Sequence, residues 1–66
     1  MIRTDKLNGV IAEKGKTKTQ VAKAIGITPK TFYNKMEKGV FGSDEIQLMI
    51  DFLDITNPME IFFAHE

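Results

Sequence analysis

Capping residues, prolines and glycines divide this chain of 66 residues into five short segments. Between these breaks, apolar residues recur three or four positions apart, which is the spacing of one face of an α-helix. No segment has the sustained alternation that is typical of a β-strand. The sequence therefore predicts an all-α protein, folded as a compact five-helix bundle. The expected helices cover residues 4–14, 18–25 and 28–38, followed by one that starts at 43 and one that starts at 57.

Local signals indicate where these helices begin. Thr17 and Gln20 have the spacing of a capping box, in which each residue satisfies a backbone N–H group of the other. Thr4, Thr28 and Asn57 are expected to cap three further helices, because their short polar side chains can accept hydrogen bonds from the first helical turn. Four of the five helices are therefore predicted from a capping residue as well as from their apolar residues.

The apolar positions predict one small core. The chain is near the lower size limit for a domain that folds alone, and it has no cysteine that could form a disulfide or bind a metal. Its hydrophobic share of 42% is ordinary for a globular protein. We expect residues 1–66 to form a single domain. The predicted core residues are Leu7, Val10, Ile11, Val21, Ala22, Ile25, Phe32, Met36, Ile46, Met49, Ile50 and Leu53.

A very short turn, Gly26 and Ile27, separates the second and third expected helices. Such a turn forces a steep crossing rather than an antiparallel hairpin. Two helices joined in this way are typical of the helix-turn-helix, whose second helix enters the major groove of DNA. The third helix could equally be one packed helix of a small bundle with another role.

The third expected helix has an apolar face and a polar face. At about 100° per residue, Phe32 and Met36 lie together, with Tyr33 at the edge of their face. Lysines can neutralise phosphates or donate to guanine, and an asparagine can bind adenine through two hydrogen bonds. The opposite face therefore suits a nucleic acid. Its residues are Lys30, Thr31, Asn34 and Lys38, flanked by Lys35.

Charge is divided between the two parts of the chain. The net charge is zero, but all nine basic residues lie within 1–38, where only three acidic residues oppose them. This part carries +6, and residues 39–66 carry −6 because they hold six acidic residues and no base. One end of the protein should attract polyanions and the other should repel them. The alternative is two ordinary solvated surfaces.

Residues 17–39, TKTQVAKAIGITPKTFYNKMEKG, resemble the helix-turn-helix of the phage repressor and Cro superfamily, also called the XRE family. The matching features are the Gln-Val-Ala step at 20–22, the Gly-Ile-Thr turn at 26–28 and the Thr-Phe pair at 31–32. Glu37 followed by Gly39 is also typical of this family, although the spacing from Gly26 is one residue longer than usual. The stretch TFYNKMEKG, the later EI…DFLDI segment and the terminal IFFA together resemble small phage-encoded regulators of Gram-positive bacteria.

This resemblance implies a five-helix bundle of the phage-repressor-like helix-turn-helix type. It also implies a Cro-like or repressor-like transcription regulator in a lysis–lysogeny switch, and usually a homodimer on two-fold operator DNA. Such a protein would act in the cytoplasm of a bacterial host, on the nucleoid when bound to DNA.

The resemblance also assigns roles to individual residues. Lys18, the first residue of the second helix, would contact a phosphate or a base edge. Pro29, Lys30 and Thr31 would read bases. Pro29, however, has no donor for the amide-to-adenine contact often found at this position. Base recognition would therefore depend mainly on Lys30, Thr31 and Asn34. The full set of expected DNA contacts is Lys18, Gln20, Pro29, Lys30, Thr31, Asn34, Lys35 and Lys38.

Three phenylalanines, Phe52, Phe62 and Phe63, are the candidate protein-interface residues. Adjacent helical residues point about 100° apart, so a short terminal helix can hardly bury both Phe62 and Phe63. We expect one to close the core and the other to lie exposed, as a dimer or partner surface. The alternative is that a core of this size needs both.

Other classes of function find little support in the sequence. There is no nucleophile–base pair, phosphate-binding loop or metal-ligand cluster, so we expect neither an enzyme nor a bound cofactor or metal. His65 is expected to belong to a fraying tail. No apolar run approaches the ~18 residues of a membrane span. The remaining alternative is a modulator or antirepressor that binds a phage repressor protein instead of DNA, which the zero net charge, Pro29 and the apolar, acidic C-terminal part favour.

Overall fold

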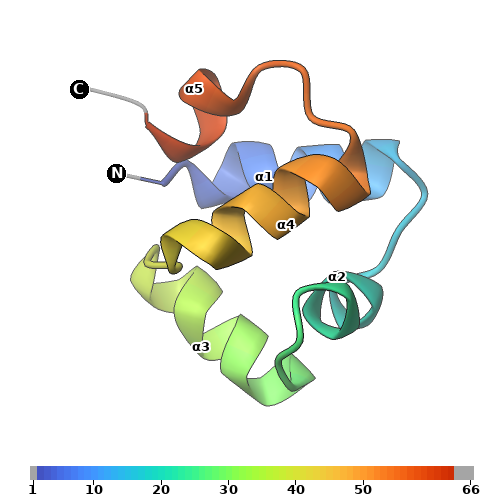
Figure 1. Cartoon of the computed structure of the whole chain (residues 1–66), viewed down its shortest axis with the longest axis vertical. Helices are drawn as coiled ribbons and strands as arrows, with labels where there is room; N and C mark the ends of the chain where they lie inside the picture. Colours follow the sequence, from blue (N-terminus) through green and yellow to red (C-terminus); the bar gives the residue numbers. More distant parts are fainter. Residues whose placement is uncertain (1, 64–66) are drawn as a thin grey trace.

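The computed structural model of the chain describes residues 2–63, and the described part is all-helical. Figure 1 shows α5 beside α1 on one side of the molecule, α2 and α3 on the other, and α4 crossing the view between them. The expected all-α, five-helix architecture is therefore observed. The helices are α1 (Thr4–Glu13), α2 (Lys18–Ala24), α3 (Pro29–Lys38), α4 (Ser43–Leu53) and α5 (Pro58–Phe62).

The helix ends in the middle of the chain follow local chemistry. The capping box before α2 is formed, because the Thr17 hydroxyl accepts from the Gln20 N–H and the Gln20 Oε1 accepts from the Thr17 N–H. Thr28 caps α3 by accepting from the N–H of Thr31, and α3 starts with a proline. Gly39 ends α3 with φ at 70°, a left-handed conformation that glycine adopts without strain.

The two side chains predicted to cap the first and last helices make no cap bond. Thr4 is the first residue of α1, and Arg3 occupies the cap position without a side-chain cap bond. Asn57 does occupy the cap position of α5, but its side chain makes no cap bond either. The start of α1 is held by another contact, because the Arg3 N–H donates to the Ile61 carbonyl at 2.6 Å. A long-range backbone bond thus fixes the start of α1 against α5.

One core lies between the helices. The predicted positions on α1 to α4 are buried or packed against it, with Val10, Ile46 and Ile50 only partly buried. The core also takes in Ile2, Phe41, Ile61 and Phe62. The Phe41 ring lies 5.6 Å from that of Phe32, so the segment between α3 and α4 closes the core beside α3.

A half-buried ion pair joins α3 to α4. Lys35 Nζ lies 2.8 Å from both carboxylate oxygens of Glu45, whose side chain is only 10% exposed. Glu45 Oε1 also accepts from the Gly42 N–H at 2.7 Å. Lys35 was expected to face DNA, but here it holds the corner between the two helices.

We predict that Glu45→Gln lowers the free energy of unfolding by about 1–2 kcal/mol, because Lys35 loses its charged partner inside a crowded corner. Urea denaturation followed by circular dichroism measures this change. Asp44→Asn is the matched control, since it removes the same charge from an exposed neighbour in the same helical turn. An equal loss in both variants would contradict the role assigned to the ion pair.

Candidate nucleic-acid interface

The site is built on α2, residues 25–28 and α3. The turn is tight because Gly26 has φ at 81°, and the N–H of Ile27 donates back to the Ala22 carbonyl. Ala22 is fully buried, and its small side chain leaves room for the helices that pack against α2. Phe32 is also fully buried, so α3 is held by its apolar face. The outward face of α3 is fixed by this packing.

A row of three exposed side chains runs along the outward face of α3. Lys30, Asn34 and Lys38 are four residues apart, so they lie one above the next on the helix. None of the three hydrogen-bonds or ion-pairs with another residue of the described chain. Three polar side chains are therefore available to an external partner.

Thr31 and Lys35, which were expected beside this row, are engaged within the protein. The Thr31 Oγ1 accepts from the Thr28 hydroxyl at 2.9 Å, and Thr31 is half-buried. Lys35 is bound to Glu45, as described above. Contact of either side chain with a ligand would need these bonds to be shared or broken.

The start of α2 contributes a second group of side chains. Lys18 Nζ lies 5.8 Å from the centre of the Tyr33 ring, within range of a cation–π contact. Gln20 uses its Oε1 atom in the capping box, so its amide donor remains for another partner. Pro29 is exposed at the first position of α3 and has no N–H to donate.

Tyr33 is a surface residue outside the set of DNA contacts expected from the sequence. Its side chain is half exposed, and it lines a shallow hollow together with Asn8, Lys16 and Lys18. The position one turn after Lys30 could have indicated it, because residues three apart are neighbours on a helix.

The three candidate interface phenylalanines separate in the structure. Phe62 is buried at 3% exposure, so it belongs to the core and offers no surface to a partner. Phe63 is about half exposed, as expected for a residue about 100° further round the helix. Phe52 is exposed on α4, where the Lys16 ammonium lies 5.4 Å from the centre of its ring. Of the three, Phe52 and Phe63 remain as surface residues.

Charged side chains elsewhere are partly engaged. The Arg3 guanidinium donates two hydrogen bonds to Asp5 and thereby lowers the pKa of that carboxyl.

Among residues 2–63, no group of acidic or histidine side chains could hold a metal ion. His65 lies outside the described residues. None of the described helices has both the length and the apolar character needed to cross a membrane.

Comparison with known proteins yields no match to a family model, a curated protein or a solved structure.

We predict that Gln20→Ala lowers the free energy of unfolding by about 0.5–1 kcal/mol without any ligand, because it removes half of the capping box. Thermal or urea unfolding of the free protein measures this loss. The control is Thr19→Ala, since Thr19 is exposed and makes no side-chain bond in the described chain. A Gln20 variant as stable as the control would leave DNA contact as the better account of this residue.

Proposed function

We propose that the protein is a sequence-specific DNA-binding transcription regulator. In this proposal α2, residues 25–28 and α3 form a helix-turn-helix, and α3 enters the major groove. The observation that carries the proposal is the exposed row of Lys30, Asn34 and Lys38 on the outer face of a helix that is fixed by its buried face. A major groove about 12 Å wide admits such a helix.

Some residues of the row are suited to contact bases and others to contact phosphates. Asn34 is suited to adenine, because its amide can donate to N7 and accept from the N6 amino group at the same time. Lys30, one turn earlier, can donate to guanine O6 and N7. Lys38 lies at the far end of α3 and Lys18 at the start of α2, where each can neutralise a phosphate.

The remaining candidates have narrower roles. Pro29 can offer only shape and apolar contact to a base, since it has no donor. The Thr31 hydroxyl is already shared with Thr28, which leaves its methyl group for a thymine. Tyr33 is added to the proposed surface, because its exposed ring lies next to Lys18.

We further propose a homodimer on two-fold operator DNA, in a phage-type switch in the cytoplasm of a bacterial host. The basic part of the chain includes α2 and α3, whereas α4 and α5 carry acidic residues and no base. Acidic helices are repelled by phosphates, so they are expected to face away from the duplex. Two exposed apolar residues at this end of the chain, Met59 and Phe63, are available for contact between two copies.

We predict that Asn34→Ala weakens binding to the preferred duplex by about 10-fold and relaxes its preference over other sequences, because a paired contact with a base is worth about 1–3 kcal/mol. Lys30→Ala should act in the same way. Selection of duplexes from a random pool, followed by fluorescence anisotropy, supplies the preferred sequence and the affinities.

The matched control is Lys6→Ala, which removes a lysine from α1 on the side facing α5. Lys38→Ala should weaken binding to all sequences alike and reduce the salt slope by about one, as expected for a phosphate contact. Binding that is unchanged in the double variant of Lys30 and Asn34 would refute the reading surface.

A second candidate function is a modulator that binds a phage repressor protein instead of DNA. Two observations favour it: Pro29 lacks a donor where a reading residue is expected, and Met59 and Phe63 leave apolar surface exposed near the end of the chain. Size-exclusion chromatography distinguishes the two candidate functions. It uses a purified repressor whose gene lies next to the gene of this protein. We expect no stable heterocomplex. A complex that Phe63→Ser abolishes, with no DNA affinity at low salt, would favour the second function instead.

A further inference from the structure

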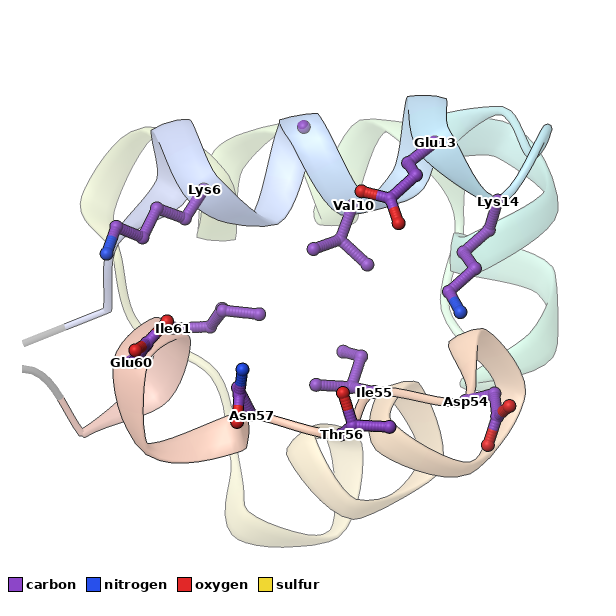
Figure 2. A pocket seen from close by; sticks show the side chains of 11 residues that line it. Lys6, Val10, Glu13, Lys14, Asp54, Ile55, Thr56, Asn57, Glu60 and Ile61 are labelled. Carbon is purple, nitrogen blue, oxygen red and sulfur yellow. The ribbon is translucent and has the colours of Figure 1, made fainter.

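A cavity of about 410 Å³ opens between α1 and the segment that joins α4 to α5. Figure 2 shows the α1 side chains on one wall and those of residues 54–61 on the other. No residue of α2 or α3 lines the cavity, so it is separate from the proposed DNA surface. Its volume lies within the range of about 300–1,000 Å³ that small-molecule sites occupy.

The middle of the cavity is apolar and both ends are charged. Val10, Ile55 and Ile61 point into the middle from the two walls (Figure 2). At one end Lys6 lies across from Glu60, and at the other end Lys14 lies across from Asp54 (Figure 2). No ion pair of the described chain closes either end. Each end thus offers a cation and an anion to a ligand.

Gly9 is the least expected residue of this wall. It lies in the interior of α1, where glycine is destabilising relative to alanine because it loses more backbone freedom. Nothing in the fold requires it, since its φ is not positive and a Cβ atom there would meet no atom within 4 Å. On the helix surface it shares a face with Lys6 and Glu13. No side chain therefore stands between these two long side chains on the α1 wall of the cavity. The glycine places no side chain at the rim of the cavity, at the expense of helix stability.

The opposite wall supplies hydrogen-bonding groups that the fold does not use. Asn57 stands at the cap position of α5 but makes no cap bond, and its amide points toward the cavity (Figure 2). An amide donates and accepts at once, which matches the N–H and C=O of a peptide bond. Glu13, on the α1 wall, adds a carboxylate near the Lys14 end (Figure 2).

We propose that this cavity binds a short apolar peptide with free termini, three residues long. Lys6 and Lys14 are eight positions apart in the sequence. This separation is about 12 Å along the helix axis, from a rise of about 1.5 Å per residue. An extended tripeptide spans about 10 Å, so its ammonium and carboxylate groups reach opposite ends. Its central side chain then lies on the apolar middle, whereas a free amino acid is too short to reach both ends.

The test is a titration of the ¹⁵N-labelled protein with the tripeptide Ala-Leu-Ala, followed by two-dimensional NMR. We expect saturable shifts of the amides of Gly9, Val10, Ile55 and Asn57, and none along α3. Free leucine, and Ala-Leu-Ala with an acetylated N-terminus and an amidated C-terminus, should each bind at least about 5-fold more weakly, because they lack one or both charged end contacts. Leucine that binds as tightly as the tripeptide, or no saturable shift at millimolar peptide, would overturn the proposal.

Two variants locate the site. Gly9→Phe should lower the affinity for Ala-Leu-Ala at least about 10-fold by filling the rim. Asn57→Ala should lower it without loss of folding, since Asn57 makes no cap bond. Ala24→Phe is the matched control, because Ala24 is exposed on α2 and lines no part of the cavity.

Folding of each variant is checked from its dispersed NMR spectrum. Unchanged peptide binding in folded Gly9→Phe would exclude this cavity, and so would equal loss in the control. This outcome does not depend on DNA binding, which is measured separately.

Discussion

The burial of Phe32 sets the direction in which α3 faces. Phe32 is fully buried, and its ring packs beside that of Phe41 from the segment after the helix. Met36, one turn later, is buried on the same face. Because the side chains of a helix turn about 100° per residue, burying this face directs Lys30, Asn34 and Lys38 away from the protein. The orientation of the polar row is therefore a consequence of core packing.

The ion pair between Lys35 and Glu45 fixes the same helix from its side. Both oxygens of the carboxylate are held by Lys35, and one of them also binds the Gly42 N–H. A charged group with so little exposure needs this full set of partners, because each missing bond would leave it desolvated and unpaired. Phe32 thus sets the rotation of α3, while Lys35 and Glu45 tie α3 to the first turn of α4.

Local signals predicted the middle of the fold well, and the errors at the start of α1, at Phe41 and at Lys35 share one physical cause, which is contact with residues that local spacing does not reveal. The capping box at Thr17 and the apolar stripes of α1 to α4 depend on residues a few positions apart, which the sequence displays directly. The start of α1 is instead held by the bond from Arg3 to the Ile61 carbonyl, and Phe41 enters the core from a segment with no periodicity of its own. In the candidate site, Lys35 has the spacing of a DNA contact, but a glutamate ten positions later binds it.

The cavity lies between the two helices whose contact holds the ends of the chain together. The last helix, α5, is short and rests on α1 through Ile61, whose carbonyl accepts from the Arg3 N–H and whose side chain lines the cavity. A chain of this size has little stability in reserve, so each contact between α1 and α5 counts. A ligand held by a lysine of α1 on one wall and by Asn57 on the other would bridge these helices and favour the folded state by mass action. Gly9 weakens α1 by itself, yet it leaves room for a ligand that ties α1 to α5, so the two effects on stability oppose each other.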